Sequence, residues 1–196
     1  MDRFFATILL MLCISACYAE EWTIEELQSA NTAADANYMT SLEKNVILYV
    51  NLARMYPKKF ARIEVEPYDG PEGFAKESGF DAYKQSLLRD LYRMNPVKAY
   101  KPSYSLYQSA YCWAEESGRL GITGHTRVSC TQPNIAECCS YGVSSSIDVV
   151  LQLLIDAGVP SLGHRINCLN SSYSKIGVSQ MPHQKWGNCT VLNMIW

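Results

Sequence analysis

The order of the elements predicts a domain of mixed α and β class, either α+β or a layered α/β/α arrangement. Helical patterns fill the first half of the chain, and strand patterns with one more helix fill the second. The 196 residues suffice for one domain with a substantial core. A hydrophobic fraction of 48%, a charged fraction of 18% and a net charge of −2 are ordinary for a globular protein. There is no basic surplus that would indicate binding to nucleic acid.

Residues 1–19 have the features of an export signal. The segment MDRFFATILLMLCISACYA has Arg3 near its start, an apolar run and small residues before Ala19. The apolar run is too short to span a bilayer, so no transmembrane span is expected. A rival interpretation is that ISAC at 14–17 resembles the lipobox of bacterial lipoproteins, in which Cys17 would carry a lipid anchor at the cell surface. Both interpretations predict an extracellular location.

Three helical segments follow a short N-terminal extension at 20–39. In the first and third segments apolar residues recur at a spacing of three to four, as on one face of a helix, and the second is a helix that stops before Pro96. The segments begin at Ser41, which can cap a helix, at Phe80 and at Ser103, and Pro57 restarts the first as a short second helix. Between them, EVEPYDGPEGFAKESGF carries Pro and Gly and is interpreted as a long loop.

The second half of the chain contains the strand patterns. The segment IAECCSYG at 135–142 is short and strand-like, and SSSIDVVLQLLIDAG at 144–158 is a buried helix. The segments SKIGVSQMP at 174–182 and GNCTVLNMIW at 187–196 predict two strands of an antiparallel hairpin. The turn between them holds His183, which we interpret as a solvated residue.

Two of the three histidines follow a glycine, His125 in TGHT and His164 in LGHR. Glu137 lies in the otherwise apolar strand, where a carboxylate costs several kcal/mol unless it is paired. Asp156 ends the buried helix, where a negative charge opposes the helix dipole and calls for a positive neighbour. Arg165 is the nearest candidate. These residues are the candidates for a cleft or binding site.

Two histidines and one or two carboxylates that meet in a cleft would form a site for a divalent metal such as zinc. The expected metal ligands are His125, Glu137 and His164. The same residues could instead perform acid/base chemistry, because histidine titrates near neutral pH. The simpler alternative is that each histidine is a loop residue with backbone hydrogen bonds. The serines show no GxSxG elbow and the cysteines are expected to be oxidised, so no nucleophile is named and no catalytic residue is assigned.

Six cysteines remain after the export signal: Cys112, Cys130, Cys138, Cys139, Cys168 and Cys189. An even number in an oxidising compartment predicts three disulfides. The neighbours Cys138 and Cys139 are too close to bond to each other, and in a strand they point to opposite faces. They should therefore reach different partners, unless some thiols stay free and buried.

Four blocks of the sequence resemble the CAP superfamily (the SCP domain of cysteine-rich secretory, antigen-5 and pathogenesis-related proteins). The blocks are NLARMYPKKFA, LYQSAYCWAEESGRLGITGH, NIAECCSYG and VVLQLLIDAGVPSLGHRINCLNSSYSKIGVS. Their order and spacing match over the segment 40–196, which the resemblance implies is the CAP domain, and GHR is typical of the microbial type. The resemblance implies a three-layer α-β-α sandwich with a small, mainly antiparallel sheet and a large open cleft.

The resemblance also implies a cleft tetrad of two histidines and two acidic residues. His125 and His164 match the histidines, and Glu137 matches the glutamate of the family motif GEN. The second acidic position has no clean match, and Asp156 is preferred to Asp148. The sequence departs from the motif after Glu137, where a cysteine replaces the asparagine.

The same resemblance implies that Cys168 bonds to Cys189. Cys138 and Cys139 would then bond to the two cysteines nearer the N-terminus, in an order that the residues do not decide. Since functional clefts admit water, we expect Glu137 to be solvated, so that Glu137→Ala would cost little stability.

Members of the superfamily resemble one another in fold more than in activity. The resemblance therefore implies a secreted binding module, whose ligand is a lipid, a sterol, a metal or an extracellular protein. The alternative is a metal-dependent hydrolase or protease, in which Glu137 activates a metal-bound water.

Overall fold

The computed structural model of the chain describes residues 20–71 and 79–196. The predicted export signal, with Cys17, and part of the predicted loop after Glu64 lie outside these residues. The described elements are α1 (Ile24–Ala30), α2 (Ser41–Met55), α3 (Pro57–Phe60), the π-helical turn η1 (Ala61–Val65), α4 (Phe80–Arg93), β1 (Lys101–Pro102), α5 (Tyr104–Leu120), β2 (Ala136–Tyr141), α6 (Ser146–Ile155), α7 (Gly163–Leu169), β3 (Lys175–His183) and β4 (Gly187–Ile195).

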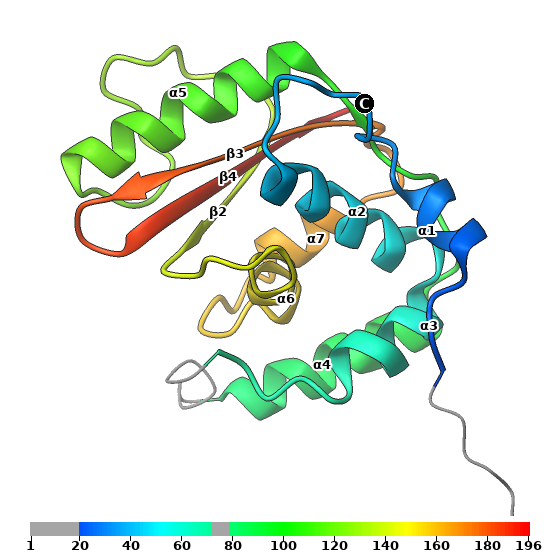
Figure 1. Cartoon of the computed structure of the whole chain (residues 1–196). Coiled ribbons are helices and arrows are strands. Elements are labelled where there is room, and N and C mark those ends of the chain that lie inside the picture. The colour runs from blue at the N-terminus through cyan, green and yellow to red at the C-terminus, as the bar shows by residue number, and fades with distance from the viewer. Residues whose placement is uncertain (1–19, 72–78) are drawn as a thin grey trace, which may run out of the picture.

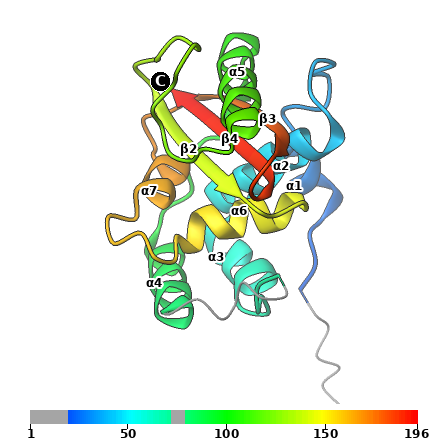
Figure 2. The same cartoon turned by 90° about the vertical axis from the view of Figure 1, so that its left-hand side faces the viewer.

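The four strands form one sheet in the order β1-β3-β4-β2. β1 is parallel to β3, whereas β3–β4 and β4–β2 are antiparallel. Helix α5 covers one face of the sheet, and α2, α6 and α7 cover the other (Figures 1 and 2). The predicted α/β class and the layered sandwich with a mainly antiparallel sheet are therefore confirmed.

Two glycines allow α5 to lie unusually close to the hairpin. A Cβ atom on Gly177 of β3 would lie 2.1 Å from the backbone nitrogen of Tyr107 in α5. A Cβ atom on Gly118 of α5 would lie 2.1 Å from the carbonyl oxygen of Pro182. Backbone therefore packs on backbone along this helix, which sets the position of the loop that follows it.

Helix α2 begins with a capping box, in which Thr40 and Glu43 each bind the other's backbone N–H. The N-cap is thus one residue earlier than the predicted Ser41. Further along α2, the buried guanidinium of Arg54 stacks on the ring of Tyr100, 3.8 Å from its centroid. It also donates hydrogen bonds to four carbonyl oxygens, those of Lys98, Cys168, Asn170 and Tyr173. Because two of these acceptors lie at the end of α7, Arg54 fixes that helix from outside.

The N-terminal extension at 20–39 belongs to the same core. Its helix α1 begins with a capping box of Thr23 and Glu26. The buried residues Ala30, Ala33 and Met39 join the large hydrophobic cluster on the α2 side of the sheet. No helix among the described residues is long and apolar enough to cross a membrane.

His183 is buried, contrary to the interpretation of its turn as solvated. Its Nδ1 accepts hydrogen bonds from the backbone N–H groups of Lys185 and Trp186, both at 3.2 Å. Its Nε2 lies 3.0 Å from the carbonyl oxygen of Ile122 and donates to it. The ring thereby closes the β3–β4 turn and ties it to the end of α5.

The disulfide pairing implied by the resemblance is wrong in this structure. Cys112 of α5 is bonded to Cys130, and the other four described cysteines, Cys138, Cys139, Cys168 and Cys189, are buried thiols. Cys168 lies in the core on the α2 side of the sheet, whereas Cys189 faces α5 on the other side. The sheet itself therefore separates the two residues that were expected to pair.

Candidate functional site

The loop between α5 and β2 carries the first histidine of the site and is held at several points. The disulfide Cys112–Cys130 ties it to α5. Gly124, directly before the histidine, accepts a hydrogen bond from Trp113 Nε1 at 3.1 Å and donates one to the hydroxyl of Tyr141, also at 3.1 Å. The position of His125 is therefore set by both α5 and β2.

Glu116 of α5 anchors the same loop from beneath. This buried carboxylate accepts hydrogen bonds from the hydroxyl of Ser129 and from the backbone N–H groups of Val128, Ser129 and Cys130. The Ser129 hydroxyl, followed by these N–H groups, lowers the pKa of Glu116 to about 2.

A pH dependence of stability follows from this anchor. Because the folded pKa of Glu116 is depressed, its contribution is present above the ordinary value of 4.5 and is lost as the pH falls towards about 2. In Glu116→Gln, the urea midpoint of unfolding should therefore decrease less than in the wild type as the pH falls from 4.5 to about 2. The neighbouring Glu115, whose side chain is 45% exposed, is the control, and Glu115→Gln should keep the wild-type dependence on pH. Equal slopes in the wild type and Glu116→Gln would contradict the anchoring role.

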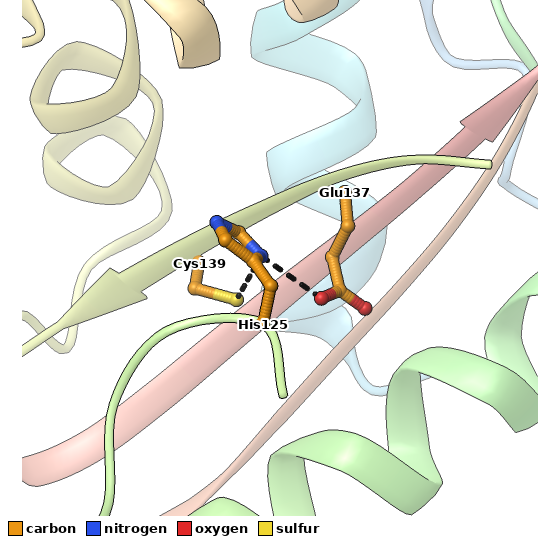
Figure 3. A group of neighbouring side chains, drawn as sticks. All are labelled: His125, Glu137 and Cys139. Atoms are coloured by element: carbon orange, nitrogen blue, oxygen red, sulfur yellow. Dashed lines mark hydrogen bonds and ion pairs between the residues drawn. The ribbon is translucent and has the colours of Figure 1, made fainter. Parts of the chain in front are cut away.

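The first half of the site is the pair of His125 and Glu137. Nδ1 of His125 lies 3.0 Å from Oε1 of Glu137, which comes from β2 (Figure 3). An ionised carboxylate only accepts hydrogen bonds, so the imidazole proton lies on Nδ1. The hydrogen bond to Glu137 raises the pKa of His125, against the opposing effect of partial burial.

Arg127 is a site residue that the sequence did not single out. Its side chain is 1% exposed and pairs with Oε2 of Glu137, whose side chain is 8% exposed. The guanidinium also donates to the backbone oxygens of Ser109 and Thr131. With its amide oriented to suit its neighbours, Asn193 of β4 donates to the same Oε2 at 3.1 Å. Glu137 is therefore enclosed and paired, and the expectation of a solvated carboxylate is corrected.

The second half of the site is the pair of His164 and Asp156. Nδ1 of His164 lies 2.7 Å from Oδ1 of Asp156. Oδ2 of Asp156 accepts from the backbone N–H groups of His164 and Arg165, at 3.0 and 3.3 Å. Asp156 lies in the left-handed region with φ of 58°, which the short Asp side chain tolerates. Asp156 is thus the C-cap of α6, and its side chain also supports the first turn of α7.

Asp156 does not pair with the guanidinium of Arg165, which was its expected partner. Arg165 is buried, and its guanidinium binds Asp90 at 2.8 Å and the carbonyl oxygens of Tyr83, Leu154 and Ile155. It does not line the cleft cavity. Arg165 therefore fastens α7 to α4 and α6 as a structural residue.

Asp148, the weaker candidate for the second acidic position, also lies away from the cavity. It accepts a hydrogen bond from the hydroxyl of Tyr68 at 2.8 Å and binds Ser145 at the start of α6. Ser145 is the N-cap of α6, and Asp148 is the residue in the first turn whose backbone N–H it accepts from.

A cavity of about 420 Å³ joins the two halves of the site. His125 and His164 both line it, with their ring centroids 6.4 Å apart. The other lining residues include the polar Tyr141 and Gln152 and an apolar wall of Leu153, Ala157, Val159 and Trp186. Two residues before His164, Leu162 has φ of 52°, a left-handed conformation that costs a non-glycine residue roughly 1–2 kcal/mol.

Both imidazoles donate a hydrogen bond from Nδ1 to a carboxylate. Among the described residues, Nε2 of His125 and Nε2 of His164 have no hydrogen-bond partner. In Figure 3 the second ring nitrogen of His125 lies on the side of the ring away from Glu137. Since the protons are on Nδ1, a neutral ring at each position keeps its lone pair on Nε2.

Cys139 lies beside the first pair and was not expected in the site. Its Sγ is 3.9 Å from Nδ1 of His125, and these two atoms and a carboxylate oxygen of Glu137 all lie within 4.8 Å of one another (Figure 3). Burial, and then the charge of Glu137, raises the pKa of the Cys139 thiol well above its ordinary value. The thiol is therefore protonated at neutral pH, and metals bind the thiolate.

No family model and no curated protein matches the sequence. Among solved structures, an outer surface protein from Borrelia burgdorferi is 19% identical, with a TM-score of 0.40, over 61% of this chain and 92% of that one. Hookworm platelet inhibitor is 12% identical, with a TM-score of 0.39, over 60% of this chain and 64% of that one. We therefore derive the function from the residues of the site themselves.

Proposed function

We propose that this chain is an extracellular binding protein whose cleft holds a divalent ion of the zinc class on Nε2 of His125 and Nε2 of His164. The observation that carries this proposal is the pair of carboxylate–histidine contacts. Glu137 and Asp156 each accept a hydrogen bond from Nδ1–H of one imidazole, which orients the ring and leaves Nε2 as the ligand atom. Metal-binding histidines in proteins are oriented in the same way.

The spacing and the charge of the residues fit such an ion. On a tetrahedral zinc ion with Zn–N of about 2.0 Å, two imidazole centroids lie roughly 5 Å apart. The rings of His125 and His164, at 6.4 Å, need to approach by about 1 Å. Two carboxylates lie directly behind the rings, and only Glu137 is paired with a cation, Arg127. A positive ion is therefore favoured in front of the rings.

The cavity suits a small ligand beside the ion. When bound, the ion supplies a Lewis-acid position that an anionic or carbonyl group can occupy. The walls formed by Leu153, Val159 and Trp186 offer apolar surface for the rest of such a ligand. A volume of about 420 Å³ is within the usual range for small-molecule sites. An amphipathic ligand with a metal-binding head group, such as a short-chain lipid, matches these features.

Binding is favoured over hydrolysis because Glu137 is already engaged. As a general base, Glu137 would have to accept a water proton on the one lone-pair site of about four that its hydrogen bonds leave open. Its Oε1 accepts from His125, and its Oε2 accepts from Arg127 and Asn193. Asp156 is occupied in the same way, by His164 and two backbone N–H groups.

The extracellular location is supported by the Cys112–Cys130 disulfide, because such bonds persist in oxidising compartments. It also agrees with the export signal expected at 1–19. The mass of the mature N-terminus distinguishes cleavage after Ala19 from a lipid anchor on Cys17.

Zinc binding to single-site variants tests the proposal. We expect His125→Ala and His164→Ala each to weaken zinc affinity by more than about 100-fold, since a ligand should matter at least as much as its supporting contacts. Competition with a chelating indicator measures this, and circular dichroism checks the fold. Cys139→Ala is the matched control, because Cys139 touches His125 but supplies no ligand here, and it should bind zinc normally. Loss of binding in Cys139→Ala with retention in His164→Ala would overturn the assignment.

A further inference from the structure

Two cysteines lie on the elements that carry opposite halves of the site. Cys138 follows Glu137 in β2, on the side of the His125 pair. Cys168 lies in α7, four residues after His164 and so one turn further along the same face of the helix. A bond between them would join the two halves directly.

The side chains of Cys138 and Cys168 meet in the core. Both are fully buried and belong to the same hydrophobic cluster. Sγ of Cys138 lies 3.7 Å from the carbonyl oxygen of His164, the carbonyl at the first turn of α7. Burial, followed by contact with the thiol of Cys168, raises the pKa of Cys138.

The other two thiols are placed differently. Cys139 and Cys189 face α5, on the other side of the sheet. Cys139 is opposite Val191 in the ladder, so Cys189 is its diagonal neighbour. Diagonal neighbours are about 7–8 Å apart, beyond the usual Cα separation of about 4.4–6.8 Å for a disulfide. Their sulfurs also have separate contacts, with Gly124 O at 3.6 Å for Cys139 and Ser117 Oγ at 3.5 Å for Cys189.

We propose that Cys138 and Cys168 form a disulfide in the mature protein, which ties β2 to α7 beneath the metal site. The inference rests on the proposed extracellular location. In the exchange, the two thiols lose two protons and two electrons to an external disulfide, such as that of a thiol oxidase or oxidised glutathione. One S–S bond forms in this chain, and the external S–S bond is reduced to two thiols.

Such a bond would limit the relative movement of the two histidine pairs. The loop closed by Cys138 and Cys168 contains α6, Asp156 and His164, and Glu137 directly precedes its first end. The residues that orient the two imidazoles would then be covalently linked through the core. Both sulfurs are shielded from solvent, so the bond should resist reduction in the folded protein.

Peptide mapping of protein secreted by a eukaryotic or periplasmic host tests the inference. The protein is alkylated in denaturant without reductant and digested with trypsin and a glutamate-specific protease. Cleavage after Glu137 separates Cys130 from Cys138, and cleavage after Arg165 separates Cys168 from both. The variant Cys139→Ser/Cys189→Ser removes the ambiguity between the adjacent Cys138 and Cys139.

We expect Cys168 linked to Cys138, with Cys139 and Cys189 alkylated as free thiols. If Cys138 and Cys168 are alkylated while the Cys112–Cys130 bond is intact, the inference is overturned, but the proposed extracellular location is not. A link from Cys168 to Cys139 or Cys189 would overturn it as well. Alkylation of all six cysteines would contradict both the inference and the extracellular location. Zinc affinity of the same samples reports separately on the metal site.

Discussion

Gly177→Ala is expected to abolish the native fold. The added Cβ would lie 2.1 Å from the nitrogen of Tyr107 and 2.2 Å from the carbonyl carbon of Leu106. Both are backbone atoms of α5, so no side-chain rotation can relieve the overlap, and the helix must move off β3. We expect a loss of more than about 4 kcal/mol, above the usual range for overpacking. That is comparable with the whole stability of a small domain, about 5–15 kcal/mol.

Ser179→Ala is the matched control for this substitution. Ser179 lies on the same face of β3, two residues further along, and is buried. Its hydroxyl has no hydrogen-bond partner within the described part of the chain, so alanine removes an unsatisfied polar group. Thermal unfolding followed by circular dichroism should show Ser179→Ala at or above the wild-type midpoint and Gly177→Ala unfolded. A Gly177→Ala protein that melts within a few degrees of the wild type would show that α5 does not pack as described.

Arg127→Met is expected to cause the second largest loss, about 3–5 kcal/mol, because it strands a buried carboxylate. Glu137 would keep only His125 and Asn193 as partners, and the contacts of Arg127 with Ser109 and Thr131 would also be lost. The pKa of His125 should rise further, since the charge of Arg127 lowers it. Urea unfolding at neutral pH measures the loss of stability.

Two further variants make this prediction specific. Arg127→Met/Glu137→Gln removes both charges and should recover part of the lost stability. Arg119→Met breaks an ion pair with Glu115 in which the arginine side chain is 57% exposed, and it should change stability by less than about 1 kcal/mol. If Arg127→Met were as mild as Arg119→Met, Glu137 would not depend on Arg127.

Much of the fold could be predicted because its signals are local. The spacing of apolar residues in α2, α4 and α5 and the alternation in β3 and β4 depend only on neighbouring residues. The capping box of Thr23 and Glu26 is also such a signal, and it marks the helix α1, which was not predicted. Helix α7 has no such signal. It has no side-chain cap; Arg54 of α2 binds its last turn, and its own Arg165 binds a carbonyl oxygen of α6, so its stability comes from tertiary contacts.

The candidate site also has residues that the sequence signals locally and residues whose role depends on tertiary contacts. His125, His164, Glu137 and Asp156 stand out in the sequence because they are polar residues beside glycine or in apolar runs. The role of Arg127 depends on how the loop after α5 folds back over β2, which no pattern encodes. The cysteines show both cases. Strand alternation places Cys138 and Cys139 on opposite faces, but their neighbours depend on which helix covers each face.

The tautomers of the histidines are the property on which metal binding at this site depends most directly. Proton–nitrogen correlation spectra of protein labelled at histidine should be recorded above the raised pKa of His125, without and with zinc. We expect the proton on Nδ1 in His125 and His164, and a shift of both Nε2 signals when zinc is added. His183 is an internal control, because its Nδ1 is an acceptor and its proton should lie on Nε2 with or without zinc. A proton on Nε2 of His125 or His164, or a zinc-dependent shift at Nδ1 instead, would contradict the proposed site.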